Sequence, residues 1–224
     1  MNTLLGRWNL RRYFHWNLHC NLRSALLLSL FFASSSSLAY LSISETAELP
    51  PANFYQIGFE PQFFTDSGGG TNVTGFFDTL FSDSTSGRLW LGTGVIDFNV
   101  GASVKYVPFP DVDNQPGIGF RAGAFFSRKN SDNSLTLQLA PLFSKKIDSE
   151  NGLFIPYAAI AMDFINTKEK NFTGTQIMFG TEYKNPEIPK MYFGLETGFN
   201  LSDAYSYISG TVTFPFDSSK GLFE

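Results

Sequence analysis

The chain has 224 residues, of which 43% are hydrophobic and 17% aromatic, yet its mean hydropathy is close to zero at -0.06. After residue 40 no run is apolar for the roughly 20 residues that a spanning helix needs, which argues against a helical membrane protein. The formal net charge of -4 argues against a nucleic-acid partner. The chain is therefore either a soluble β-protein or a membrane barrel, in which polar lumen residues dilute the lipid-facing ones.

Residues 1–39 have the composition of a cleavable signal peptide. They contain four Arg and no Asp or Glu, and an apolar run at 25–33 follows the basic part. Small residues then lead to Ser37-Leu38-Ala39, so we predict cleavage after Ala39 and export by the general secretory route. The true start codon is left open. Removing this segment changes the formal charge from -4 to -8, which argues further against nucleic acid.

Residues 40–52 follow the predicted cleavage site and contain Pro50 and Pro51. An ordered plug and a loose periplasmic lead are the two alternatives for them. Their composition favours the loose lead, so the sequence predicts a periplasmic N-terminal segment here.

From residue 53 onward, segments of alternating apolar and polar residues are separated by turn clusters. A period of two places successive side chains on opposite faces of a strand. The clusters between these segments are rich in Asn, Asp, Gly and Pro, with a spacing typical of antiparallel hairpins. Strands are predicted at 55–64, 98–109, 118–127, 135–144, 191–200 and 205–216, with turns at 111–117, 129–133, 148–152, 166–171 and 185–187.

The region 65–97 decides the number of strands. As a loop it would be about 30 residues long, which is unusual in a compact domain. It contains two short strand patterns, at 72–79 and 88–94. The predicted fold is therefore an all-β, antiparallel, up-and-down transmembrane barrel over residues 53–216, with ten strands favoured and eight as the alternative. Both numbers are even, so both ends of the barrel chain fall on the periplasmic side. Residues 217–224 form a short C-terminal tail.

Polar residues in the middle of the predicted strands are the candidate lumen. If the apolar faces meet lipid, the interior receives charged and amide side chains flanked by Gly and other small residues. That pattern is typical of a narrow lumen filled by paired charges, although on a soluble sandwich the same residues would be surface charges. The candidates are Glu60, Lys105, Arg121, Gln138, Asp163, Gln176, Glu182 and Glu196.

Aromatic placement favours the membrane barrel over the sandwich. The last strand alternates strictly and ends in Phe214 and Phe216. Five further aromatic residues begin upward strands or end downward ones, so they are predicted to form an aromatic girdle at one interface. They are Tyr55, Tyr106, Tyr157, Tyr183 and Tyr192.

With this terminal strand, residues 53–216 resemble the small OmpA/OmpX-type outer-membrane barrels. The eight-residue tail departs from the many members that stop at the terminal aromatic residue. The resemblance implies an integral outer-membrane location, contact with outer-membrane lipid and lipopolysaccharide, and insertion by the barrel-assembly machinery. A monomer is favoured. The resemblance implies no function, because this architecture hosts enzymes, pores, adhesins and anchors.

Catalytic chemistry has few candidate residues. Both histidines, His15 and His19, and the single Cys20 precede the predicted cleavage site. The mature chain then has no side chain for a Ser-His pair, and a zinc site is not expected. No catalytic, cofactor-binding or metal site is predicted, so the chain is not expected to be an enzyme.

Three functions are compatible with the sequence. The favoured one is a structural or anchoring barrel, because the interior of eight to ten strands is roughly filled by side chains. The second is a narrow pore for ions or small solutes, which would prefer cations because acids outnumber bases in the lumen. The third is a surface adhesin or receptor, which the short predicted outer loops disfavour.

Overall fold

The computed structural model describes residues 40–66, 69–217 and 219. The predicted signal peptide at 1–39 and most of the predicted tail lie outside the described residues. The described residues form eleven strands, all antiparallel to their neighbours. They are β1 (Phe54–Phe64), β2 (Thr71–Ser82), β3 (Thr85–Gly94), β4 (Phe98–Phe109), β5 (Gly117–Lys129), β6 (Asp132–Ser144), β7 (Ile147–Ser149), β8 (Gly152–Thr167), β9 (Asn171–Lys184), β10 (Tyr192–Ser202) and β11 (Tyr207–Asp217).

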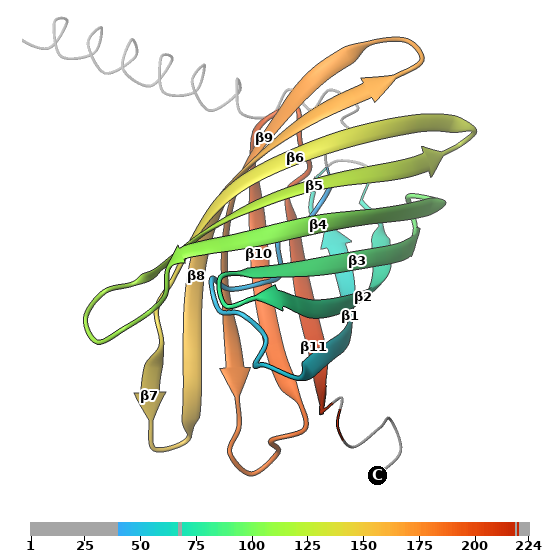
Figure 1. Ribbon diagram of the computed structural model, residues 1–224. Helices are drawn as coiled ribbons and strands as arrows, with labels where there is room; N and C mark the ends of the chain where they lie inside the picture. Colours follow the sequence, from blue (N-terminus) through green and yellow to red (C-terminus); the bar gives the residue numbers. More distant parts are fainter. Residues whose placement is uncertain (1–39, 67–68, 218, 220–224) are drawn as a thin grey trace, which may run out of the picture. The chain divides into compact units, whose positions relative to one another are not determined.

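The strands close into a barrel. Each long strand pairs with the next along the chain, β1 pairs with β11, and β6 pairs with β8. The three-residue β7 pairs only with the first residues of β8 and follows β6 after a short break. The described residues therefore form a closed, up-and-down barrel of ten strands with one short extra strand, and the predicted fold is confirmed (Figure 1).

The uncertain region 65–97 forms two full strands of the wall. β2 and β3 are longer than the predicted segments 72–79 and 88–94, and they meet in a tight turn at residues 83 and 84. This is why the barrel has ten strands rather than eight. With an even number, β1 begins and β11 ends at the same rim, which we call the periplasmic end.

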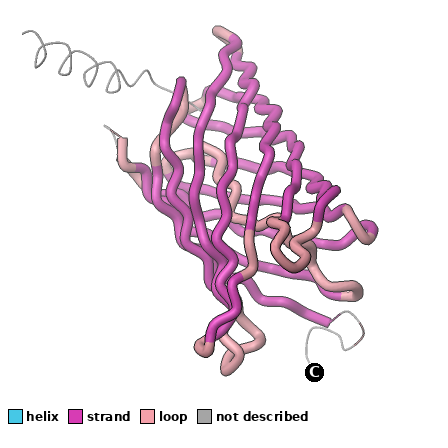
Figure 2. Tube along the Cα trace, turned by 90° about the vertical axis from the view of Figure 1, so that its left-hand side faces the viewer, coloured by secondary structure: helices cyan, strands magenta, loops and turns pink. Residues whose placement is uncertain are grey.

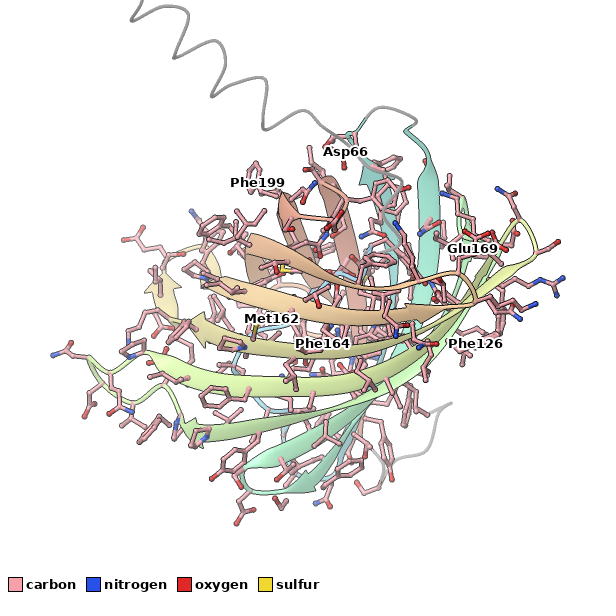
Figure 3. All side chains as sticks on the ribbon, turned by 90° about the horizontal axis from the view of Figure 1, so that it is seen from above. Asp66, Phe126, Met162, Phe164, Glu169 and Phe199 are labelled. Carbon is pink, nitrogen blue, oxygen red and sulfur yellow. The ribbon has the colours of Figure 1, made fainter. Side chains whose placement is uncertain are left out.

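The outer surface of the barrel is apolar. The outward positions of the strands carry many large hydrophobic side chains, each with 39–62% of its surface exposed. A soluble protein rarely exposes such a continuous apolar surface, whereas a bilayer covers it. Figure 3 labels four of these side chains, Phe126, Met162, Phe164 and Phe199.

The predicted tyrosine girdle is correct only in part. Tyr55 and Tyr106 are exposed on the outer surface, and Tyr183 stacks there on Phe154. Tyr157, however, is only 7% exposed and binds Glu196 inside the barrel. Tyr192 shares the face of Glu196 on β10. The prediction used position along the strand and ignored which face each residue occupies.

The largest correction concerns residues 40–52. We call residues 40–48 the lumen segment, because they lie inside the barrel and are mostly buried. Figure 1 shows this part of the chain in blue within the ring of strands, and Figure 2 shows it as a loop inside the wall. The expected loose periplasmic lead is wrong for these residues, because their backbone groups bind charged side chains of the wall.

Candidate functional site

Glu196 on β10 holds the middle of the lumen segment through its backbone. Its two carboxylate oxygens accept hydrogen bonds from the N–H groups of Ile43 (3.1 Å) and Ser44 (2.7 Å). Ser44 has a φ of 44°, in the left-handed region. Two successive N–H groups that converge on one anion form the arrangement known as a nest. Glu196 therefore recognises the path of the backbone rather than particular side chains.

Two tyrosines complete the surroundings of Glu196. The hydroxyls of Tyr157 on β8 and Tyr207 on β11 donate to its carboxylate at 2.9 and 2.5 Å. Each ring lies over a glycine of the wall. A Cβ atom at Gly180 would be 2.3 Å from the Tyr157 ring, and one at Gly198 would be 2.3 Å from the Tyr207 ring. These two glycines provide the space that lets both hydroxyls reach one carboxylate.

Glu60 on β1 holds the same part of the segment through hydroxyl groups. Its carboxylate accepts hydrogen bonds from Ser42 Oγ at 2.9 Å and Ser44 Oγ at 2.7 Å. Because β1 and β10 are separated only by β11, Glu60 and Glu196 form one acidic side of the lumen.

The opposite side of the lumen is basic and binds the carbonyl groups of the segment. Arg88 on β3 donates to the carbonyl of Ser44 at 3.1 Å. Arg121 on β5 donates to the carbonyls of Ser42 (2.7 Å) and Ile43 (2.9 Å). Lys105 on β4 donates to the carbonyls of Thr46 (2.8 Å) and Glu48 (2.6 Å).

This division of charge explains why an irregular segment is stable inside the barrel. A buried backbone group without a hydrogen bond carries a large free-energy penalty. Here acids meet N–H and hydroxyl donors, and bases meet carbonyl acceptors, so each type of backbone group faces the complementary charge. Charged partners make such hydrogen bonds roughly twice as strong as neutral ones. The lumen segment and the wall therefore satisfy each other.

The segment adds one charge of its own. The Glu45 carboxylate lies 3.0 Å from Lys105 Nζ and 3.3 Å from Arg121 Nη1, and both bases are almost fully buried. Near the periplasmic end, the Ala47 N–H donates to Ser144 Oγ at 3.1 Å and Glu48 pairs with Lys146. Contacts to the wall thus continue along the whole segment.

A small cavity lies between the segment and the wall. This cavity of about 20 Å³ is lined on one side by Tyr40, Leu41 and Ser42, and on the other by wall residues such as Gln62 and Trp90. This volume holds roughly one water molecule. Such a cavity is far too small to serve as a path for hydrated ions.

The predicted lumen residues separate into three groups. Glu60, Lys105, Arg121 and Glu196 are buried and bind the lumen segment, as described above. Gln138, Asp163 and Gln176 are buried on neighbouring strands, where Gln138 accepts a hydrogen bond from Arg121 Nε at 3.1 Å and Gln176 donates to the Tyr205 carbonyl. Glu182 lies apart, half-buried and paired with Lys184 on its own strand at 3.0 Å.

Sequence reasoning missed several residues of the lumen. Asp78 and Arg88 form a buried pair with contacts of 2.5 and 2.6 Å, and the Arg88 guanidinium lies 4.2 Å from the centre of the Phe76 ring. Counting by two along β2 and β3 would have placed both on the inner face. Tyr157 and Tyr207 could have been found in the same way. Glu45 lies outside any strand pattern, so no periodic signal marks it.

No group of three or more His, Cys, Asp or Glu side chains in the described part of the chain lies close enough together to hold an ion. The chemistry that the described lumen offers is the binding of a peptide backbone by fixed charges.

Comparisons with known proteins reach only as far as the fold. No known protein family matches the sequence, and no curated protein matches it. Among solved structures, a bacterial polysaccharide outer membrane secretin matches over 72% of this chain, with 10% identity and a TM-score of 0.45. The chain covers 65% of that structure, just under two thirds of its length. LpxR from Salmonella typhimurium matches over 73% of this chain and 84% of its own, with 13% identity and a TM-score of 0.46. An outer membrane channel from Pseudomonas putida F1 matches over 79% of this chain and 99% of its own, with 8% identity and a TM-score of 0.44.

The geometry itself indicates where the protein resides. Apart from the three-residue β7, its strands are 10 to 16 residues long, which meets the 9–11 residues that a tilted strand needs to cross a bilayer. The closed wall leaves no unpaired edge, its outside is apolar and its inside is polar. The protein is an integral outer-membrane β-barrel.

Proposed function

We propose that the protein is a structural or anchoring barrel of the outer membrane whose lumen is closed by its own residues 40–48. The observation that carries this proposal is the complementary binding of the segment, with its N–H groups on Glu196 and its carbonyls on Arg88, Lys105 and Arg121. These contacts use the mid-strand charges that a conducting pore would leave facing water.

A non-enzymatic role is part of the proposal. The described lumen charges are occupied by the segment or by each other, except around Asp163. No His or Cys occurs after residue 20 of the sequence. Insertion by the barrel-assembly machinery, contact with lipopolysaccharide and a monomeric state belong to the same proposal.

The outward connections favour a structural role over an adhesin. At the end opposite the periplasmic rim, the links between strands have only a few residues, for example 130–131 and 168–170. They offer little surface for recognition of a large partner. Asp66 and Glu169, on two of these links, are labelled in Figure 3.

Single-channel recording in a planar lipid bilayer tests the proposal. The protein as processed by the cell, with folding verified by heat-modifiable gel migration, should be electrically silent. A variant that lacks residues 40–48 should show discrete conductance steps. These steps should prefer cations, because four buried acids of the wall (Glu60, Asp78, Asp163 and Glu196) then face three buried bases (Arg88, Lys105 and Arg121).

A second variant covers the case in which the deletion does not fold. The double substitution Glu60→Gln with Glu196→Gln keeps the segment but removes both of its acidic contacts, so brief openings should appear. Steady conductance of the unaltered, folded protein would contradict a closed barrel and would favour the narrow cation-preferring pore.

A further inference from the structure

Asp163 on β8 is the one lumen acid that has neither an ion pair nor a hydrogen bond within normal geometry among the described residues. Its side chain is 0% exposed, and neither carboxylate oxygen has a hydrogen bond. Glu45, Glu60, Asp78 and Glu196 are also buried, but each is paired or hydrogen-bonded. A buried carboxylate without a counter-charge is strongly unfavourable, so this position requires an explanation.

Unpartnered polar atoms of two neighbouring side chains surround the same place. Gln138 on β6 is directly opposite Asp163, and its Nε2 has no partner. On the other side, β9 places Gly174 opposite Asp163, and Gln176 follows two residues later with an unpartnered Oε1. Gly174 contributes no side chain between Asp163 and Gln176. Three oxygen atoms without partners therefore belong to adjacent inward-facing positions of the wall.

The bases of the lumen are directed elsewhere. Arg121 is near, because it binds the Gln138 Oε1 atom, but its remaining N–H groups point to Glu45 and to carbonyls of the lumen segment. Arg88 pairs with Asp78, and Lys105 pairs with Glu45. Arg121 is thus close enough to act on Asp163 through its charge, but its hydrogen bonds go to other acceptors.

We propose that Asp163, with Gln176, forms a buried site for a small cationic group. One carboxylate and one amide oxygen suit a hard, singly charged ion such as Na+, or an ammonium group, better than a doubly charged ion that needs several carboxylates. The site lies in the wall itself, so it does not depend on the structural role proposed above.

The cationic group has two possible sources with the same chemistry. The first is Na+ from solution. The second is the α-ammonium group that the predicted cleavage after Ala39 creates at residue 40. Tyr40 is 2% exposed inside the barrel, and its side chain lies close enough to Asp163 for the two groups to interact electrostatically.

Unfolding in urea at fixed ionic strength tests the first source. The processed protein is folded into phosphatidylcholine vesicles, and Na+ is exchanged for N-methylglucamine. For a single site, the unfolding constant should fall about tenfold for each tenfold rise in Na+ above the dissociation constant. Asp163→Asn should abolish this dependence. Glu182→Gln, which removes one negative charge from the wall away from Asp163 and from the lumen segment, should retain it.

Acylation of the N-terminal amine tests the second source. If the α-ammonium group occupies the site, the stability is independent of Na+ and the α-amine is protected from acylation in the folded protein. The reaction is followed by mass spectrometry of the N-terminal peptide. The α-amine should react at least about tenfold faster in Asp163→Asn than in Glu182→Gln, because loss of the carboxylate disfavours the unreactive ammonium form. The proposal is overturned if Na+ has no effect and Asp163→Asn leaves the acylation rate unchanged.

Discussion

At the scale of single residues, the Asp78–Arg88 pair shows how a charge is kept inside this barrel. The two residues are directly opposite each other on β2 and β3, and two hydrogen bonds of 2.5 and 2.6 Å join them. Arg88 also donates to the lumen segment and lies over the Phe76 ring. One side chain thus links the wall, an aromatic residue and the segment.

Replacement of Arg88 should therefore be costly. Arg88→Met leaves Asp78 buried and unpaired, so the free energy of unfolding should fall by about 3–5 kcal/mol. The double variant Arg88→Met with Asp78→Leu should recover a large part of this loss, because no unpaired charge remains. Urea unfolding in lipid vesicles measures both. Arg128→Met, at an exposed position of β5, is the matched control. A loss below about 1 kcal/mol for Arg88→Met would show that the buried pair is not formed.

Residue faces were predictable only where the alternation was counted through each strand. Tyr157 is six positions from Asp163 on β8, and Tyr192 is four from Glu196 on β10. Even separations put each tyrosine on the inner face, which contradicts a girdle. The period of two is therefore sufficient to place Tyr157, Asp78 and Arg88 in the lumen.

At the scale of elements, the lumen segment depends on the acidic side of the wall. Glu196 receives four hydrogen bonds, two from backbone N–H groups of the segment and two from tyrosine hydroxyls. A glutamine at this position offers only one acceptor oxygen and adds an N–H donor that faces other donors. The nest around residues 43 and 44 then loses its anion.

Glu196→Gln should release the segment without opening the wall. Hydrogen bonds to charged groups contribute about 1.5–3 kcal/mol each, so we expect a loss on the order of 2–4 kcal/mol in the free energy of docking. Hydrogen exchange at Ile43 and Ser44 should rise by at least about 30-fold, while exchange in the middle of β5 and β6 stays slow. Glu187→Gln, in an exposed turn, is the control. Unchanged exchange at both amides would contradict the contact with Glu196.

The location of residues 40–48 could not be predicted from their composition. Their binding relies on N–H and carbonyl groups, which every residue other than proline carries. The side chains that contribute, such as Ser42 and Ser44, have the same polarity as those of a solvated linker. The wall, by contrast, shows an alternation of apolar and polar residues with charges in mid-strand. The strands could therefore be predicted, and the place of the lumen segment could not.

At the scale of the whole molecule, both the wall of the barrel and its lumen are closed. The hydrogen-bonded wall closes through β1–β11 and β6–β8, which removes every strand edge from the lipid. The lumen closes because the chain that leads into β1 occupies it. The sequence predicted the first closure through strand number and turn spacing. The second depends on contacts between residues about 15 to 150 positions apart, which no local pattern records.

A designed disulfide tests most directly whether the lumen is closed by the chain's own segment. A Cβ atom at Gly117 on β5 would lie 3.3 Å from the Ala47 Cβ, close to the 3.5–4.5 Å of natural disulfides. In outer membranes the variant Ala47→Cys with Gly117→Cys should therefore form an intramolecular disulfide, detected as a shift in gel mobility that a reductant reverses. Ala47→Cys with Ala122→Cys, whose second position is exposed on the outer face of β5, should remain reduced. A folded barrel in which the first pair also stays reduced would contradict a lumen segment seated inside the wall.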